Sequence, residues 1–573
     1  MSYGLNMKAA EQIFARRDTK LVILLGILAL AGFLRFFMLS EIGIQGDDTL
    51  YYLAVAKGWV APPENYRPVI MGLYGLATRV GQQDSDWSIK ALNAGLDLLS
   101  VLLTFLIGLR ISTRWRVALL SALAYALLPR AIAFSRTELL HTASATFLLT
   151  SVLFLLTALG KPYSKRRWIL LGFSGVFIGL GYGVHEDPIL FAPGMVTCIL
   201  LSVLRGQATS RARLRAALAQ TAAFVAPCLT VLTPLGFWTR FTRELGDVAS
   251  LAGVTGGAKA PPRGGLADIP YSELFNNMVE FNSSLVIAFL FYALLLAPAG
   301  LGLSARLLDW PRAEGRLRQA SRSLDILAFA PVILVSSYLL LYPFVTWYVG
   351  PRHFLPAMPL VLISTLFWMD WTVGLLVKEG AARNVFFSCA ALAVIGVTAS
   401  QGSIFHEIYR KIPPEHRDRY HLYNARTIPL QLTHSFDASK YPISPYRTVY
   451  NLLRDRVDAR NRLLVAPYAI SSAGGARRGF RHYFGDDAVY IEDCPDDLAQ
   501  YLASRKVRYI VFAGFHSRRL SGTPRCLPFG DAKYSIQTEA KLLNSFLVDG
   551  GYRFKVRWRT DRFTIIEILG EER

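Results

Sequence analysis

Two adjacent carboxylates, Asp47 and Asp48, follow the first long apolar stretch of the chain. Like charges are costly to hold side by side, so the pair suggests chemistry at a membrane surface. A carboxylate within hydrogen-bond reach of an attacking hydroxyl or amine can accept its proton as a general base. The same residues would equally well cap the interfacial helix expected at 50–59, and one carboxylate can cap while the other reacts. Catalysis and capping therefore both remain open for this pair.

Three arginines are expected on the same membrane face as the carboxylate pair. Arg67 directly precedes Pro68, Arg136 follows Ser135, and Arg352 opens a later apolar stretch. Guanidinium groups form charge-assisted, bidentate contacts with phosphate, so these residues are candidates for binding the phosphate of a substrate. Arginines at helix ends also serve as anchors in the membrane interface. Anchoring is the commoner role for Arg67 and Arg136 taken singly and an equal alternative for Arg352. Arg67 and Arg136 together with Arg130 place positive charge on the same membrane face as the carboxylates.

A tight turn at 185–188 adds further candidates. Asp187-Pro188 has the form of a helix cap followed by the first helical residue, so capping explains Asp187 better than function does. The neighbouring His185 and Glu186 are candidate substrate contacts. Further candidate contacts of the same kind are Tyr51, Glu138 and His141.

The elements that must position these residues are membrane helices. Of 573 residues, 53% are hydrophobic, and the mean hydropathy is +0.33. Apolar runs of about 20 residues recur over the first 400 positions, which predicts a polytopic α-helical membrane protein with about eleven transmembrane helices. The expected spans are 21–39, 88–109, 115–134, 137–159, 168–184, 187–204, 214–235, 284–305, 324–343, 353–371 and 384–400.

Charge sets the predicted orientation of these helices. Lys and Arg gather in the connections on one side, whereas the three short connections on the other side carry only Arg130, Arg136 and Arg352. By the positive-inside rule, the N-terminus is therefore cytoplasmic. An odd number of helices then places three long segments outside the cytoplasm: 40–87, 236–283 and 401–573.

The chain divides into a transmembrane domain, 1–400, and an extracytoplasmic domain, 401–573. In the second domain, short β-type runs alternate with helical patterns at 496–505 and 536–548, which predicts a small α/β fold. The β-type runs begin at Arg462, Ala488, Val507 and Phe563. Cys494 and Cys526 are the only cysteines outside the apolar stretches, and an oxidising compartment would allow a disulfide between them.

Two other classes of protein fit the sequence less well. The formal net charge of +21 could indicate nucleic-acid binding, but the basic residues lie in short connections or in the tail, and no nucleic-acid module is recognisable. A transporter or lipid flippase would carry ionisable groups near the membrane midplane and usually an internal repeat. Here the unusual charges gather at one surface and no repeat is visible. Transport without transfer chemistry stays the alternative reading.

The order of these motifs resembles that of the GT-C membrane glycosyltransferases, in particular the bacterial and archaeal relatives of the protein O-mannosyltransferases and of the lipid A aminoarabinose transferase. The acidic pair and tyrosine after the first helix, the basic residue before proline and the Ser-Arg turn carry the resemblance. The segments 179–188 and 350–359 add to it. The resemblance covers roughly residues 20–400.

The resemblance implies an inverting transfer of a sugar from a polyprenyl-phosphate donor on the outer face of the membrane. Asp47 then matches the family's first acidic residue, and Asp48 stands where many members have Glu, so the identity of the base stays open. Arg67 takes the place of a basic residue that contacts the donor phosphate, and Arg136 matches the arginine of the Ser-Arg turn. Glu138 lies where some relatives carry another acid. The acceptor class, whether glycan, lipid or protein, is not implied.

No cofactor is expected from the sequence, and a divalent metal stays an open alternative that is not favoured. Relatives that use lipid pyrophosphate donors need a divalent metal, whereas those that resemble this chain often do not, and two aspartates alone are a thin set of ligands. No Cys/His spacing in the chain has the form of a zinc site. The leaving group is already a phosphate anion, so it needs cationic partners and no acid.

Overall fold

The computed structural model describes much of the first 400 residues and parts of the tail. The described residues are 3–37, 67–81, 85–137, 140–161, 164–204, 210–237, 326–345, 354–376, 445–465, 480–481, 483–490, 498–513, 552–559 and 563–571, with isolated positions at 39, 52, 55, 385, 389, 392 and 396. The chain forms two compact units, Met1–Leu39 with Pro62–Thr433, and Ser40–Ala61 with His434–Arg573. Residues 397–444 lie outside the described part, so the predicted domain boundary at residue 400 stays a prediction.

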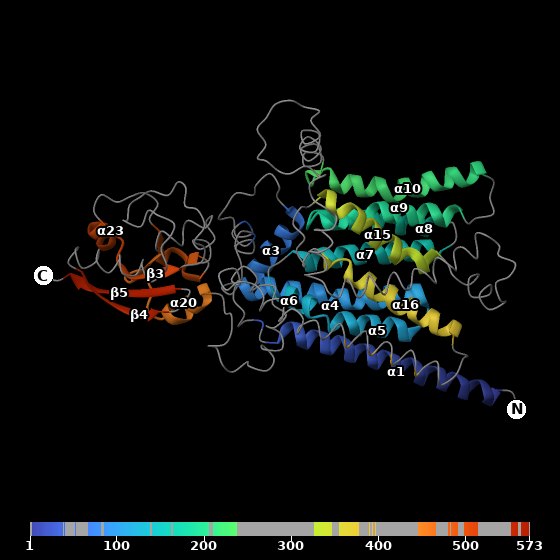
Figure 1. Ribbon diagram of the computed structural model, residues 1–573, viewed down its shortest axis with the longest axis horizontal. Helices are drawn as coiled ribbons and strands as arrows, with labels where there is room; N and C mark the ends of the chain where they lie inside the picture. The colour runs from blue at the N-terminus through green and yellow to red at the C-terminus, as the bar shows by residue number, and fades with distance from the viewer. Residues whose placement is uncertain are drawn as a thin grey trace, which may run out of the picture. The chain divides into compact units, whose positions relative to one another are not determined.

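The first unit is a bundle of helices that lie side by side (Figure 1). Its helices are α1 (Tyr3–Phe36), α3 (Pro68–Val80), α4 (Ser85–Ser112), α5 (Trp115–Ala126), α6 (Pro129–Ser135), α7 (His141–Leu159), α8 (Lys165–Tyr182), α9 (Ala192–Leu204), α10 (Ser210–Leu232), α15 (Ile326–Val345) and α16 (Met358–Leu376), with the 3₁₀ turn η2 (Asp187–Phe191) between α8 and α9. Helix α7 packs against α4 on one side and α8 on the other, and α8 packs in turn against α10. Helix α7 is therefore a central element of the unit.

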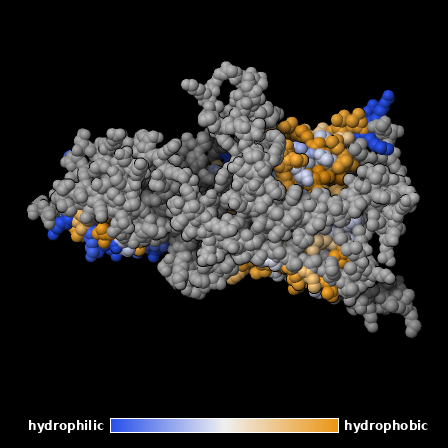
Figure 2. All heavy atoms as spheres, viewed as in Figure 1, coloured by the Kyte–Doolittle hydropathy of each residue, from blue (hydrophilic) through white to orange (hydrophobic). Residues whose placement is uncertain are grey.

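Several helices are long and apolar enough to cross a membrane. Four spans meet that length and composition among the described residues: Asp18–Phe36, Trp87–Ser112, His141–Leu159 and Arg211–Leu232. Large apolar side chains stay exposed on the outer helices, for example Val22 of α1 and Leu214 and Leu218 of α10. Apolar surface of this kind is visible over the helical unit in Figure 2. Such surface fits contact with lipid, because hydrocarbon does not penalise exposed apolar groups.

The apolar runs predicted the helices well, with one clear error. The span expected at 115–134 is broken, because α5 ends at Ala126 and α6 begins at Pro129. Proline lacks the N–H that a continuous helix needs, and it disfavours helical geometry at the preceding residue. The spans at 284–305 and 384–400 lie outside the described residues, apart from four isolated helical positions in the second. The number of about eleven helices therefore stays a prediction.

Two glycines allow α8 and α10 to approach closely. A Cβ atom added to Gly175 would lie 2.0 Å from the carbonyl oxygen of Phe224, and one added to Gly179 would lie 2.9 Å from Cβ of Val231. Small residues at such positions are a common means of helix association in membranes. The contact fixes the direction of α8, whose C-terminal end leads into the turn at 185–188.

The described part of the second unit includes a five-stranded sheet and two short α-helices. The strands are β1 (Arg462–Val465), β2 (Ala488–Tyr490), β3 (Val507–Ala513), β4 (Tyr552–Arg559) and β5 (Phe563–Glu571), in the order β2-β1-β3-β5-β4, and the helices are α20 (Pro445–Leu453) and α23 (Leu498–Ser504). Strand β1 is parallel to β2 and β3, whereas β5 is antiparallel to β3 and β4. The four expected β-type runs and the helix at 496–505 have counterparts here, while 536–548, Cys494 and Cys526 lie outside the described residues.

The orientation of the chain in the membrane stays a prediction that a reporter can test. Alkaline phosphatase fused after residue 410 should be active, because the uneven distribution of Lys and Arg places the tail outside the cytoplasm. The matched control is the same fusion after residue 206, in an expected cytoplasmic connection, which should be inactive. Activity of the second fusion but not of the first would overturn the predicted orientation.

Candidate functional site

The turn between α8 and α9 is held by backbone hydrogen bonds. The amides of Val184 and His185 both donate to the carbonyl oxygen of Gly181, at 3.0 and 2.9 Å. Turn η2 then begins at Asp187, with Pro188 as its second residue, and Glu186 in the capping position makes no side-chain cap hydrogen bond. The prediction that Asp187 is chiefly a helix cap is therefore wrong, because its carboxylate is directed toward two histidines instead.

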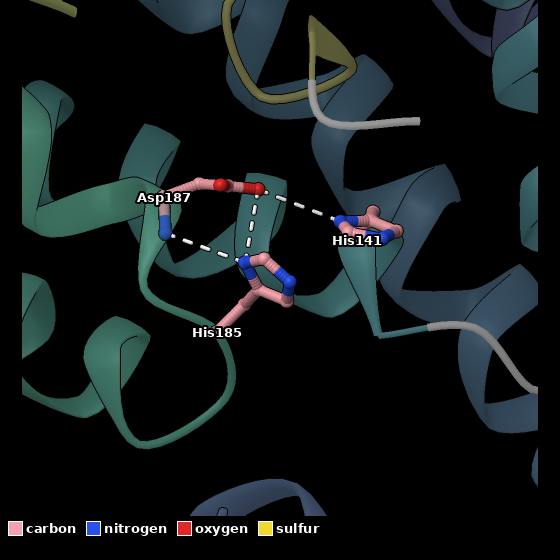
Figure 3. A group of neighbouring side chains, drawn as sticks. All are labelled: His141, His185 and Asp187. Atoms are coloured by element: carbon pink, nitrogen blue, oxygen red, sulfur yellow. Dashed lines mark hydrogen bonds and ion pairs between the residues drawn. The ribbon is translucent and has the colours of Figure 1, made fainter. Parts of the chain in front are cut away.

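Those two histidines and Asp187 form a buried cluster (Figure 3). The Oδ2 atom of Asp187 lies 3.0 Å from Nδ1 of His185 and 3.4 Å from Nδ1 of His141, the first residue of α7. The backbone amide of Asp187 also donates to Nδ1 of His185, at 3.3 Å. The two imidazole rings lie with their centroids 4.4 Å apart. All three side chains are at most 4% exposed, so the cluster is closed to bulk water.

The environment of His185 favours its neutral form. Burial lowers the pKa of His185, the carboxylates of Asp187 and Glu186 oppose this by raising it, and the charge of Arg67 lowers it further. Burial has the largest effect, because a charged imidazolium loses its hydration inside the protein. A neutral imidazole has one nitrogen with a lone pair, which can accept a hydrogen bond or bind a metal.

Arg67 lies beside this cluster and pairs with Glu186. Its Nη2 atom is 2.9 Å from Oε2 of Glu186, and both side chains are about one-fifth exposed. The same oxygen of Glu186 lies 3.7 Å from Nδ1 of His185. The pair thus connects the partly exposed guanidinium to the buried cluster.

A second contact fixes the start of α3 to the same turn. The amide of Val69 donates to the carbonyl oxygen of Gly183, at 3.3 Å. A Cβ atom on Gly183 would lie 2.5 Å from Cγ2 of Val69, so a larger residue would push α3 away. A side chain at position 183 would therefore displace Val69, the second residue after Arg67.

Arg136 has a different environment from Arg67. Its side chain is 2% exposed, and its Nη2 atom donates to the carbonyl oxygen of Phe37, at 2.5 Å. It thereby joins the turn after α6 to the end of α1. The predicted contact of Arg136 with a donor phosphate stays a prediction, and the structure adds a structural role.

The structure brings together four of the residues singled out from the sequence. Arg67, His141, His185 and Glu186 lie within one connected group, which Asp187 completes. Apart from Arg136, the remaining predicted site residues lie outside the described residues: Asp47, Asp48, Tyr51, Glu138 and Arg352. Their predicted roles stay predictions.

A second buried polar network lies inside the bundle and was not predicted. Nε of Arg35 on α1 lies 2.5 Å from Oδ2 of Asp97 on α4, and the hydroxyl of Tyr125 on α5 donates to Oδ1 of the same carboxylate at 2.7 Å. Arg35 also donates to the carbonyl oxygens of Ala31 and Ala126. The side chains of Arg35, Asp97 and Tyr125 are fully buried. Two opposite charges within apolar runs were the sequence signal for this pair.

Part of the helical unit matches a known protein family. A family model described as dolichyl-phosphate-mannose-protein mannosyltransferase matches residues 75–242. The resemblance to GT-C glycosyltransferases is confirmed over this segment. The matched segment contains His141 and the turn at 185–188, whereas Arg67 and the predicted carboxylate pair precede it. No curated protein matches the chain.

Several solved structures are similar to the chain at low sequence identity. ArnT from Cupriavidus metallidurans in the apo state is 14% identical with a TM-score of 0.49, covering 96% of this chain and 98% of that one. The apo oligosaccharyltransferase of Archaeoglobus fulgidus is 14% identical with a TM-score of 0.46, covering 86% and 69%. The S. cerevisiae Pmt1-Pmt2 complex bound to the sugar donor is 16% identical with a TM-score of 0.34. That alignment covers 39% of this chain, and this chain spans only 34% of the length of the yeast chain.

Proposed function

We propose that this protein is an integral membrane glycosyltransferase that moves a sugar from a polyprenyl-phosphate donor to an acceptor on the outer face of the membrane. The observation that carries the proposal is the match of residues 75–242 to a family named for a dolichyl-phosphate sugar donor. Arg67 also supports the proposal. It precedes the matched segment, but its partly exposed guanidinium lies beside the cluster that the segment contains. A lipid-linked phosphate needs such a cationic partner near the membrane interface.

The reaction is a single displacement at the anomeric carbon. An acceptor hydroxyl or amine attacks that carbon, the bond between the carbon and the phosphate oxygen breaks, and the anomeric configuration inverts. Asp47 or Asp48 takes the proton of the acceptor as general base. The electron pair of the broken bond leaves with the polyprenyl phosphate, whose growing negative charge is stabilised by Arg67, with Arg136 and Arg352 as further candidates.

The Arg67–Glu186 pair prepares the guanidinium for this task. A guanidinium carries five N–H donors in a rigid fork, so it can bind one carboxylate and still present donors to a phosphate. Glu186 and the Val69–Gly183 hydrogen bond together restrict where Arg67 can lie. A preorganised cation stabilises the leaving group without first having to be ordered.

Consumption of the donor separates transfer from transport. Full-length protein purified in detergent, given a panel of polyprenyl-phosphate sugars with an extract of envelope glycans, lipids and proteins, should release polyprenyl phosphate and label one acceptor. A transporter or flippase reconstituted in the same way would leave the donor intact while moving it across the bilayer. Donor movement without consumption would therefore replace this proposal with the transport alternative.

Substitution of Arg67 should act mainly on donor binding. Arg67→Ala removes a charge-assisted contact worth about 1.5–3 kcal/mol, so we expect KM for the donor to rise by about ten- to a hundredfold. Arg67→Lys keeps the charge but loses the bidentate geometry, so its KM for the donor should lie between those of wild type and Arg67→Ala. The measurement is steady-state kinetics with varied donor concentration.

The matched control for Arg67 lies on α3, the helix that begins directly after it. Arg79 is exposed near the C-terminal end of α3, and Arg79→Ala should leave KM for the donor unchanged. An equal KM for wild type and Arg67→Ala would show that Arg67 is only a membrane anchor or a partner of Glu186.

A further inference from the structure

Three ligand atoms meet at one buried point in the turn between α8 and α9. Each of His141, His185 and Asp187 offers one ligand atom, and these three atoms lie within 4.8 Å of one another. We propose that these three side chains bind a single divalent transition-metal ion of the Zn²⁺ type. Figure 3 shows both imidazole rings turned toward the carboxylate from different elements.

The distances suit a tetrahedral ion. With bonds of about 2.0–2.1 Å from Zn²⁺ to nitrogen or oxygen, neighbouring ligand atoms lie about 3.3–3.4 Å apart. The two distances to Oδ2 of Asp187 are 3.0 Å from His185 and 3.4 Å from His141. The third distance, between the ligand atoms of the two histidines, is at most 4.8 Å, so binding of an ion would draw these two side chains closer together.

The contacts of His185 are compatible with a bound cation. Its Nδ1 atom would need a proton to donate to Oδ2 of Asp187, at 3.0 Å, and a lone pair to accept from the amide of Asp187, at 3.3 Å. One nitrogen of a neutral imidazole cannot do both. If Nδ1 carries no proton, its lone pair faces the carboxylate oxygen at 3.0 Å, and an ion between them would relieve that repulsion; Nδ1 would then give up the 3.3 Å contact with the amide, because it has only one lone pair.

The ligand types select the ion. Two imidazoles with one carboxylate are a known ligand set of zinc sites that keep a fourth position for water or substrate. Imidazole nitrogen suits Zn²⁺ and its neighbours in the first transition row, whereas Ca²⁺ and Mg²⁺ prefer sites made wholly of oxygen. The burial of all three side chains, at 4% exposure or less, would protect the bonds from competing water.

A use for the ion follows if the proposed transfer reaction is correct. Oε2 of Glu186 lies 3.7 Å from Nδ1 of His185 and 2.9 Å from the guanidinium of Arg67, so the ion would add positive charge beside the candidate phosphate contact. This use rests on the proposed function, whereas binding of the metal does not. The proposal departs from the expectation, drawn from the sequence, that no metal takes part.

Metal binding is testable without any substrate. Full-length protein with its affinity tag removed is stripped with a chelator, returned to metal-free buffer, and titrated with Zn²⁺ by calorimetry. We expect about one Zn²⁺ per chain, and a Co²⁺ complex with the intense visible absorption of four-coordinate cobalt. His141→Ala, His185→Ala and Asp187→Asn should each weaken binding by more than about a hundredfold and abolish that absorption.

Glu186→Gln is the matched control. It removes a carboxylate next to the cluster but none of the three ligand atoms, so Zn²⁺ affinity should stay within a few-fold of wild type. Thermal unfolding checks each variant, and if His185→Ala fails to fold, His141→Ala and the nearly isosteric Asp187→Asn carry the test. Absence of Zn²⁺ and Co²⁺ binding by wild type, or equal binding by the folded variants, would overturn the site.

The two proposals fail separately. A protein that binds Zn²⁺ through this cluster but never consumes a polyprenyl-phosphate sugar keeps the metal site and loses the transferase function. A protein that transfers the sugar and binds neither Zn²⁺ nor Co²⁺ keeps the function and loses the metal site.

Discussion

Replacing Asp47 with Asn should slow sugar transfer by about 10²–10⁴-fold, the usual cost of removing a general base. The side chain keeps its size but can no longer accept the proton of the acceptor. Asn caps helices as well as Asp does, so a merely structural aspartate would tolerate the change. Affinity for the donor should stay near that of wild type, because the donor phosphate is held by cations. The measurement is single-turnover transfer with saturating donor and acceptor.

Asp48 needs the same test, because the sequence leaves open which carboxylate is the base. Asp47 is the stronger candidate, since it keeps the residue type of the glycosyltransferases that the chain resembles, whereas Asp48 is one methylene shorter than the Glu of many relatives. Asp18→Asn, at an exposed position near the start of the first membrane span, is the control for loss of a carboxylate. Near-native turnover in both Asp47→Asn and Asp48→Asn would exclude catalysis by this pair.

The helices of the first unit could be predicted because lipid imposes a simple rule. A segment that crosses the bilayer must satisfy its own backbone hydrogen bonds and keep an apolar surface, so an apolar run of sufficient length specifies a helix. The same rule failed at 115–134, where the run stays apolar through Leu127 and Leu128 although α5 and α6 are separate. The deciding residue there is Pro129, whose effect is local and leaves the hydropathy unchanged.

In the tail, one strand was not predicted from the sequence. Strand β4 was not predicted, although Tyr552-Arg-Phe-Lys-Val-Arg-Trp-Arg559 alternates apolar and charged residues without interruption. Alternation of this kind is typical of a strand with one face against a core and one face in water. The predicted strands were found from short β-type runs that contain neighbouring apolar residues. Strand β4, paired only with β5 among the described strands, contains no two neighbouring apolar residues.

The candidate site could be predicted only in part, because packing of distant segments creates it. His185, Glu186 and Asp187 adjoin one another in the sequence, but His141 belongs to a different helix and reaches them only because α7 packs against α8. No spacing of Cys and His residues along the sequence predicts such a cluster. Asp187 also illustrates how a local motif misleads: Asp-Pro has the form of a helix cap, yet its carboxylate is directed toward His141 and His185.

Loss of the Asp97 carboxylate should have the largest effect on stability. Asp97→Ala leaves Arg35 buried among α1, α4 and α5 without its anion, a change that typically costs about 3–5 kcal/mol. The measurement is the free energy of unfolding in detergent, or the midpoint of thermal unfolding where unfolding is irreversible.

Asp370→Ala is the control for Asp97→Ala. It removes a buried carboxylate whose cationic partners are not themselves fully buried. The side chain of Asp370 is 3% exposed, but its partners Arg114 and Arg116 are 45% and 32% exposed, so they can turn toward water when it is lost. Asp370→Ala should therefore cost less than Asp97→Ala. The double variant Arg35→Met with Asp97→Leu should recover most of the loss, because an apolar pair leaves no charge uncompensated. Equal destabilisation by Asp97→Ala and by the double variant would contradict this prediction. It would mean that lost packing among these three helices, rather than an uncompensated buried charge, causes the destabilisation.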